Sequence, residues 1–413
     1  MQEVRESAYA GKQKIIRGGK QMKAIVFGAG KIARGFIGQL LYLSKADITF
    51  VDIDQQLVDR LNKDQKYHVY ILGDSSLDSD VTGFQAVQLE DEKRIGAALV
   101  EADIAFVSVG GANLKSLGEK IGRIYKENGI PKKPFNFVTC ENWRHAGAFL
   151  YEGITAEMEE QEKTMFDQFV GVNEAVIMRS ATQPSDELAM QDATGVWVQN
   201  YWYLPISAEH FKGELPPIQD AELMQNFGDF LTQKMYTNNT SNAVIAYHGY
   251  LAGYELLAEA ANSPEVSALL DEVYEEINQT LVAELHVDPQ QQKAFAEKAR
   301  AKYTDWTIVD RVIRHGKDPL RKLGAQDRLI APARMALNHG VYPRVIIETI
   351  AKALFFDEES DASARKLKAM RREHGIPYVL QTVCELNEQE PLYREVLKAV
   401  DRICKEGLVK GHE

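Results

Sequence analysis

The segment Gly28–Gly35, which reads G-A-G-K-I-A-R-G, places the strongest constraint on how this chain can fold. It directly follows the short apolar run K-A-I-V-F, which is typical of a buried strand, and it leads into a helical stretch. Gly28 allows a sharp turn, and Gly30 lets another group approach the backbone closely. Ala33 occupies the third position of the G-x-G-x-x-G spacing, where only tight packing of helix on strand is needed. The segment therefore predicts a strand–turn–helix unit with a phosphate-binding helix N-terminus.

An acidic residue at a second strand end narrows what this turn binds. Asp52 ends the apolar run Ile48–Ile53, about 20 residues after Gly30. A carboxylate there accepts hydrogen bonds from ribose hydroxyls and repels a 2′-phosphate, so we expect NAD rather than NADP. FAD is a smaller competitor, and a glycine turn that only packs is the structural alternative. The cofactor-binding residues expected from the turn and the second strand are Gly28, Ala29, Gly30, Lys31, Ile32 and Asp52.

The two halves of the chain differ in pattern, which predicts an α/β fold with two domains. In the first half apolar strands alternate with helical stretches, as in a Rossmann-type, doubly wound parallel sheet. The second half is dominated by long helical patterns and predicts an all-α domain. We expect a leader over 1–21, the NAD-binding domain over 22–210 and the helical domain over 211–413. Strands are expected at 23–28, 48–53, 104–109, 135–139 and 195–205, and helices at 37–43, 56–62, 154–168, 221–235, 243–261, 264–285, 289–302 and 391–404.

Composition and charge exclude several classes of protein. The net charge of −12 argues against a nucleic-acid binder, and no apolar run is long enough to span a membrane. The three cysteines, Cys140, Cys384 and Cys404, form no C-x-x-C pair, which favours the cytoplasm. No motif with zinc-ligand spacing is present, so we expect no metal. The polar leader is interpreted as a disordered extension, or as upstream sequence before a start at Met22.

Four phrases together resemble the polyol-specific long-chain dehydrogenases, which form the mannitol dehydrogenase family. They are FGAGKIARGFIG, TCENW around Glu141 and Asn142, FKGELP, and DPLRKLGAQDRLIAP over Asp318–Pro332. The resemblance runs from Met22 almost to the C-terminus. It implies an NAD-linked, metal-independent oxidation of a sugar alcohol, with the active site between a Rossmann domain and a helical domain. It also implies that Glu141 belongs to the cofactor site.

The resemblance further implies a lysine base in a K-x4-N-x2-H motif. Here the stretch gives Lys234 and Asn239, but Asn242 stands where the family has histidine, and Met178 replaces an acidic residue. A lysine can act as base only if burial or nearby positive charge lowers its pKa. The amides of Asn239 and Asn142 could hold the developing carbonyl oxygen. The structural alternatives are a surface lysine, helix capping by Asn239 within T-N-N-T-S-N, and a loop role for Asn142. The stretch T-N-N-T-S-N is a poor helix former and predicts a break or restart of the helix.

A local basic cluster, Arg321, Lys322 and Arg328, predicts recognition of a substrate phosphate, with helix-end capping and surface salt bridges as the alternative. We therefore expect interconversion of a sugar-alcohol phosphate and a ketose phosphate, of the mannitol 1-phosphate and fructose 6-phosphate type. A different polyol or sugar acid, or an NAD-binding homologue whose catalysis is impaired by Asn242, remain alternatives. His248 and His339 are expected to be structural. A monomer and a homodimer are equally compatible with this sequence.

Overall fold

The computed structural model describes residues 21–143, 145–182, 192–407 and 409, which form two compact units divided between Gln225 and Asn226. This division lies later than the expected one at 210/211. The reason is that β12 (Ala221–Met224), expected to begin a helix, pairs in parallel with β11 (Leu204–Ser207) and so belongs to the first unit. Residues 1–20 of the expected leader lie outside the described residues.

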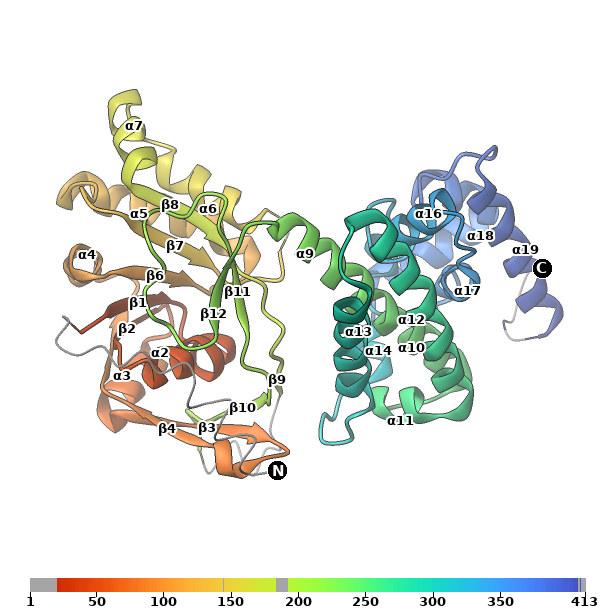
Figure 1. The fold of residues 1–413 in the computed structure, drawn as a ribbon, viewed down its shortest axis with the longest axis horizontal. Coiled ribbons are helices and arrows are strands. Elements are labelled where there is room, and N and C mark those ends of the chain that lie inside the picture. Colours follow the sequence, from red (N-terminus) through yellow and green to blue (C-terminus); the bar gives the residue numbers. More distant parts are fainter. Residues whose placement is uncertain (1–20, 144, 183–191, 408, 410–413) are drawn as a thin grey trace. The chain divides into compact units, whose positions relative to one another are not determined.

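The centre of the first unit is a six-stranded parallel sheet (Figure 1). Strand β1 alternates its side chains between the two faces, because Ile25 and Phe27 join one hydrophobic core and Ala24 and Val26 join the other. Both faces are therefore covered, as a parallel sheet requires. In spatial order the strands are β5 (Phe84–Gln88), β2 (Asp47–Asp52), β1 (Lys23–Phe27), β6 (Ile104–Val107), β7 (Phe135–Thr139) and β8 (Val170–Glu174).

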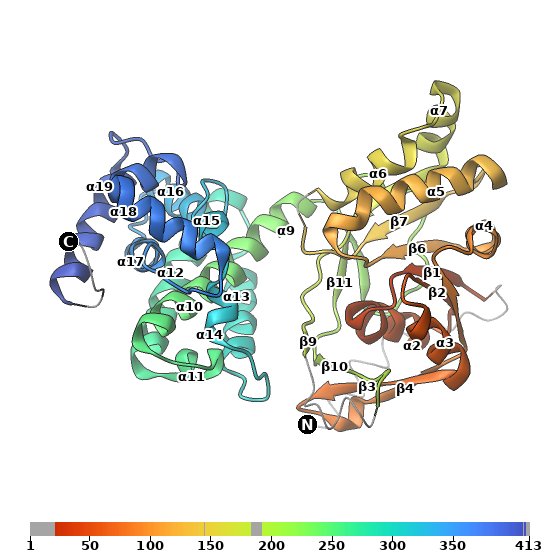
Figure 2. The ribbon, with the colours of Figure 1, turned by 180° about the vertical axis from the view of Figure 1, so that it is seen from behind.

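Helices cover this sheet, and α5 and α6 pack against each other on one face (Figure 2). Helices α4 and α7 contribute to the same core, whereas the segment after β1, together with α3, contributes to the core of the other face. The helices are η1 (Ala33–Gly38, a π-helical stretch), α2 (Gln39–Leu43), α3 (Gln55–Asp64), η2 (Ser75–Leu77), α4 (Glu92–Glu101), η3 (Gly111–Asn113), α5 (Leu114–Asn128), α6 (Ala146–Thr155) and α7 (Glu160–Phe169).

A second sheet of four strands lies in the same unit. Its order is β4 (Ser79–Thr82), β3 (Lys66–Leu72), β10 (Val196–Gln199) and β9 (Ala181–Thr182). The sequence predicts one strand over 195–205, but the chain forms β10 and then leaves the sheet before β11. The single helix expected over 154–168 is likewise two helices, α6 and α7, with a break at residues 156–159.

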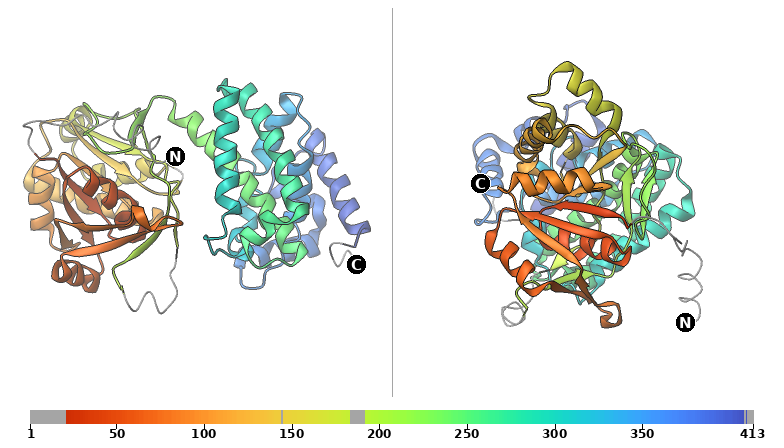
Figure 3. Two further views of the ribbon diagram at one scale, coloured as in Figure 1. Left: turned by 60° about the horizontal axis from the view of Figure 1, so that its bottom comes forward. Right: turned by 90° about the vertical axis from the view of Figure 1, so that its left-hand side faces the viewer.

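Among the described residues of the second unit, the regular elements are helices apart from one isolated β-bridge, and several long helices lie side by side (Figure 3). Helices α12, α13 and α19 match their predicted ranges closely, whereas the range 243–261 divides into α10 and α11. The helices are α9 (Phe227–Lys234), η4 (Met235–Asn239), α10 (Thr240–Ala252), α11 (Leu257–Asn262), α12 (Pro264–Leu285), α13 (Pro289–Thr304), α14 (Val312–Gly316), α15 (Pro319–Lys322), α16 (Ile330–Asn338), α17 (Arg344–Ala353), α18 (Ala362–Thr382) and α19 (Pro391–Lys405).

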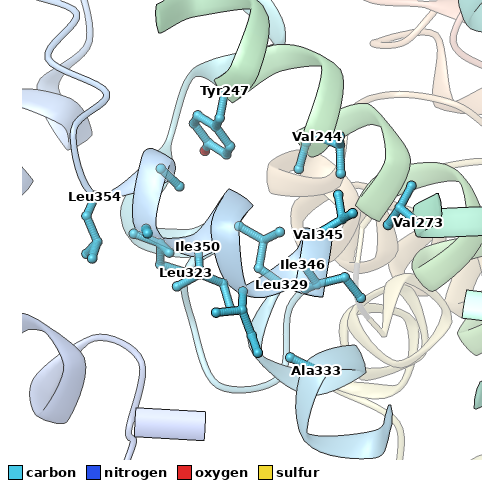
Figure 4. Close-up of a cluster of buried hydrophobic side chains, with 14 of the residues drawn as sticks. Val244, Tyr247, Val273, Leu323, Leu329, Ala333, Val345, Ile346, Ile350 and Leu354 are labelled. Carbon is cyan, nitrogen blue, oxygen red and sulfur yellow. The ribbon is translucent and has the colours of Figure 1, made fainter. Parts of the chain in front are cut away.

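The core of the second unit forms around α10 and α17. Val244 and Tyr247 of α10 lie near Val345 and Ile350 of α17 in a dense apolar cluster (Figure 4). Leu323 is fully buried in the same cluster, which fixes the loop that carries the predicted basic residues. The α/β fold class with an all-α second domain is confirmed. The three cysteines are free, and no helix among the described residues is long and apolar enough to cross a membrane.

Candidate active site

The glycine turn has the geometry that its sequence predicts. Gly28 has φ of +92°, and a Cβ atom there would lie 2.1 Å from the carbonyl oxygen of Ser108. Only glycine fits this position without moving the backbone. At Gly30, by contrast, a Cβ atom would meet no atom within 4 Å. The backbone of Gly30 therefore faces open space, which a pyrophosphate approaching the helix N-terminus requires.

Asp52 lies directly beside this turn. Its Oδ2 accepts a hydrogen bond from the backbone N–H of Ala29 at 2.5 Å, and its Oδ1 accepts one from Asp54 at 2.9 Å. The carboxylate thus holds the turn and remains partly exposed at the carboxyl end of β2. The neighbouring Ile53 is 71% exposed and presents apolar surface next to the acid. These residues fit an adenosine whose ribose hydroxyls meet Asp52.

The loops after β6 and β7, on the other side of β1 from β2, supply further residues of this site. Strand β1 lies between β2 and β6, so the chain order switches direction there, and ligands bind outside the carboxyl ends of such strands. After β6, Gly110 donates its N–H to the carboxylate of Glu141 at 2.6 Å, and burial raises the pKa of Glu141. Asn142 follows as an exposed residue. Burial and the charge of Arg34 lower the pKa of Lys31 in the turn.

Lys234 lies at the end of α9 in the second unit, and its surroundings favour the neutral amine. Burial, followed by the positive charges of Lys302 and Arg328, lowers its pKa from 10.5 to about 8. Burial also lowers the pKa of Lys302 to about 8, against the opposing effect of Asp310. Lys234 therefore becomes a proton acceptor from about pH 8 upward, at a lower pH than a lysine in water, which suits an alcohol base.

The composition of the stretch after Lys234 predicts a break in the helix, but the helix continues through it. Residues Met235–Asn239 instead form a π-helical turn that joins α9 to α10 without interruption. The wide turn is supported from outside, because the carbonyl of Asn238 accepts a hydrogen bond from the Tyr303 hydroxyl at 2.9 Å. Asn239 forms no cap and directs its Nδ2 to the sulfur of Met235 at 2.9 Å. Such π turns are often found at functional sites.

Asn242 is buried on α10 and contacts a histidine that the sequence did not single out. Its Nδ2 lies 3.0 Å and its Oδ1 3.2 Å from Nδ1 of His315. Nε2 of His315 lies 2.7 Å from a carboxylate oxygen of Asp310. Burial alone would raise the pKa of Asp310, but its hydrogen bond to His315 and the charges around it lower the pKa overall. An imidazole thus contacts the residue at the position where the resemblance implies a histidine.

The predicted phosphate-binding residues have partners within the second unit. Arg321 donates to Asp318 at 2.7 Å and to Asp327 at 3.2 Å, and Arg328 donates to Asp327 at 2.8 Å. The ammonium of Lys322 is buried and donates to the backbone carbonyl of His315. Burial and the two arginines lower the pKa of Lys322 to about 7. The three side chains are close together, but much of their charge is already balanced.

Met178, His248 and His339 each have contacts within their own unit. Met178 accepts a hydrogen bond at its sulfur from the Tyr201 hydroxyl at 3.2 Å, in the first unit. His248 is 2% exposed and contacts Thr349 and Lys352 inside the helical core, and His339 ends α16 beside Glu284. Both histidines are therefore structural, as predicted. Among the described residues, no three His, Cys, Asp or Glu side chains are arranged to hold a metal ion.

Sequence reasoning missed Lys302, Asp310 and His315. Each lies more than 60 positions from Lys234 along the chain and in no phrase with a recognisable spacing. Only the packing of α13 and α14 against the segment around η4 and α10 brings them to this site. The one sequence signal that pointed toward them was Asn242, which stands where the resemblance implies a histidine. The expected site therefore lacked an imidazole.

Comparison with known proteins now adds to this geometry. The model of the mannitol dehydrogenase Rossmann domain matches residues 22–220, and the model of the mannitol dehydrogenase C-terminal domain matches residues 226–404. The chain belongs to the mannitol dehydrogenase family. It is similar to the mannitol-1-phosphate 5-dehydrogenase of Caldanaerobacter subterraneus subsp. tengcongensis, with 33% identity over 91% of this chain and 97% of that protein. The enzyme of the same name from Bacillus pumilus is 32% identical over 92% of this chain and 100% of the relative.

Solved structures share the fold. A substrate-free D-sorbitol dehydrogenase has a TM-score of 0.78 at 14% identity and covers 94% of each chain. The Pseudomonas fluorescens mannitol 2-dehydrogenase in complex with NAD and D-mannitol has a TM-score of 0.67 at 14% identity, over 94% of this chain and 93% of that one. As a mannitol dehydrogenase family member with the turn and acid described above, the chain is an oxidoreductase whose cofactor is NAD.

Proposed function

We propose that this protein oxidises a sugar-alcohol phosphate to a ketose phosphate with NAD, and that mannitol 1-phosphate and fructose 6-phosphate are the pair. The observation that carries the proposal is the environment of Lys234. Its pKa of about 8, lowered by burial and by Lys302 and Arg328, gives the site a base for an alcohol proton. The relatives at 31–33% identity bear the name mannitol-1-phosphate 5-dehydrogenase, which supports this substrate.

The chain's own groups divide the work of this reaction. NAD supplies the hydride acceptor when it is bound at the turn of Gly28 and Gly30. Lys234 in its neutral form takes the proton of the reacting hydroxyl and becomes an ammonium. That ammonium and the amide of Asn239 then stabilise the oxygen as it becomes a carbonyl. We propose that Asn142, in the first unit, donates a further hydrogen bond to this oxygen.

Positive charge near Lys234 bears on whether the substrate carries a phosphate. Arg328 and Lys302 both act electrostatically on Lys234, so positive charge gathers at the reacting end of the site. We propose that this charge, with Arg321 and Lys322, attracts a dianionic phosphate. A second candidate function is oxidation of an unphosphorylated polyol or a sugar acid. The pairing of Arg321 and Arg328 with Asp318 and Asp327 favours it, because these carboxylates offset part of the charge.

A substrate panel with NAD separates the two candidates. It contains mannitol 1-phosphate, glucitol 6-phosphate, mannitol, sorbitol and mannonate, and NADH formation is followed at 340 nm. We expect mannitol 1-phosphate to have the highest kcat/KM. Fast oxidation of an unphosphorylated member, with none of mannitol 1-phosphate, would contradict the proposal. The variant Arg328→Met should lower kcat/KM much more for the phosphorylated members than for the others, whereas the exposed control Arg372→Met should change nothing.

A further inference from the structure

Asn242 stands where the resemblance implies a histidine, yet an imidazole reaches this residue from another helix. His315 lies on α14, and Asn242 lies on α10, which packs against α14. The two side chains are joined at 3.0 Å between Nδ2 of Asn242 and Nδ1 of His315. Nothing in the spacing of the sequence connects positions 242 and 315, so this contact is a product of the fold.

Asp310 influences which nitrogen of the His315 ring carries the proton, and therefore which nitrogen faces Asn242 as an acceptor. Its carboxylate accepts the proton on Nε2 of His315 at 2.7 Å, which leaves Nδ1 as a lone pair in the neutral ring. A lone pair on Nδ1 accepts from the Asn242 amide nitrogen and repels the amide oxygen. Both ends of the amide lie close to Nδ1, with Nδ2 at 3.0 Å and Oδ1 at 3.2 Å, so His315 restricts the rotation of the Asn242 side chain.

The backbone that carries His315 is itself held in place. Lys322 donates its buried ammonium to the carbonyl of His315, and the hydroxyl of Tyr247 donates to the carbonyl of Gly316 at 3.1 Å. Val312 is fully buried at the start of α14. Arg314 pairs with Asp310 from the outer side. The contact between His315 and Asn242 is thus supported by a set of anchors around α14 rather than by a chance approach of two mobile side chains.

We propose that His315, oriented by Asp310, is a positioning residue that acts through Asn242 and replaces the function of the motif histidine from a different helix. This inference rests on the proposed polyol oxidation at Lys234. It assigns to the triad Asp310–His315–Asn242 the task of presenting a fixed acceptor and donor to a substrate hydroxyl beside the reacting carbon. Misplacement of a substrate by about 1 Å can reduce turnover by ~100-fold, which sets the scale of the effect.

The kinetic test uses four variants of the full chain with mannitol 1-phosphate and NAD. His315→Leu should lower kcat/KM by about 10- to 100-fold, because Asn242 is then free to rotate. His315→Asn places an acceptor near the position of Nδ1 and should keep most of the activity. Asn242→His in the His315→Leu background returns an imidazole to the motif and should restore most of the loss. His339→Leu, which removes an imidazole at the surface, is the matched control.

These outcomes separate positioning from a merely structural role. If His315 only stabilises the unit, activity follows the melting temperature and neither His315→Asn nor the double variant recovers kcat. Activity of His315→Leu within twofold of the wild type would overturn the inference while leaving the proposed function intact.

A second measurement does not depend on turnover, so it tests the inference even if no substrate of the panel is oxidised. In protein labelled with 15N at asparagine side chains, the Asn242 amide protons should exchange slowly with solvent. They should shift in both Asp310→Asn and His315→Leu but not in His339→Leu. An Asn242 amide signal that is unchanged in His315→Leu would contradict the inference even without an active substrate.

Discussion

The turn around Gly28 and the cluster around Lys234 differ in what they are made of. The turn offers backbone N–H groups and open space at Gly30, and the neighbouring carboxylate of Asp52 accepts hydrogen bonds from two backbone donors. The cluster brings several cations together in a partly buried region, where Lys234, Lys302 and Lys322 all have lowered pKa values. The glycines of the turn therefore serve binding through backbone shape, whereas the chemistry depends on lysines whose pKa values are lowered by burial and neighbouring charge.

This difference predicts that substitutions in the two regions change the stability of the protein in opposite directions. A lysine with a lowered pKa destabilises the folded state at neutral pH, because the unfolded chain binds its proton more tightly. The destabilisation is complete below about pH 8 and disappears as the pH rises toward 10.5. Removing such a lysine from the cluster should stabilise the protein, whereas replacing Gly28 in the turn should destabilise it.

The largest expected effect is that of Lys234→Met. Loss of the base should lower kcat for polyol oxidation by about 100- to 10,000-fold. The free energy of unfolding at pH 7 should rise by about 1–3 kcal/mol, and this gain should shrink above pH 8. Steady-state kinetics and urea unfolding at pH 7 and pH 9.5 measure both. The exposed lysine variant Lys293→Met is the control. An active Lys234→Met enzyme would remove Lys234 from the mechanism.

A matched pair of glycine variants tests the turn. Gly30→Ala places a methyl group in open space, so the protein should keep its melting temperature but bind NADH at least about 10-fold more weakly. Gly28→Ala forces a Cβ atom against Ser108 and should lower the free energy of unfolding by roughly 2 kcal/mol or more. Thermal unfolding and fluorescence titration with NADH distinguish them. Equal loss of stability in both would show that the space at Gly30 is needed for folding.

Asp52→Asn should have a smaller effect, seen mainly in the choice of cofactor, although it also removes one backbone hydrogen bond at the turn. Loss of the carboxylate weakens hydrogen bonds to the ribose hydroxyls and removes repulsion of a 2′-phosphate. NAD binding should fall by about 10-fold while NADP binding changes little or improves. The ratio of kcat/KM for NAD and NADP measures this directly. An unchanged ratio would mean that Asp52 only holds the turn through Ala29.

The smallest effect expected is a change in pH dependence caused by Lys302→Met. Removing this positive charge favours the protonated form of Lys234, so its pKa should rise from about 8 by about one unit. The rising limb of the oxidation rate should move to higher pH by the same amount, with little change at the plateau. A limb that moves to lower pH, or does not move, would contradict the electrostatic coupling of the two lysines.

The two regions also differ in how far the sequence could predict them. The turn is local, so Gly28, Gly30 and Asp52 could be assigned from spacing alone, and the Rossmann-type sheet followed from the same pattern. Lys234 and Asn239 came from a motif, but composition wrongly suggested a helix break where a π turn continues the helix. Lys302, Asp310 and His315 could not be found, because long-range packing of α13 and α14, not spacing, brings them to Lys234 and Asn242.

The central claim, that Lys234 acts as a base with a lowered pKa, is tested most directly by the pH dependence of kcat/KM for polyol oxidation in the wild type. Neutral Lys234 is the active form in this direction, so the rate should rise tenfold per pH unit below the pKa and level off above about pH 8. Ketose reduction, which needs the ammonium, should fall over the same range. A limb near pH 10.5, the ordinary value for lysine, or no limb between pH 6 and pH 10, would contradict it.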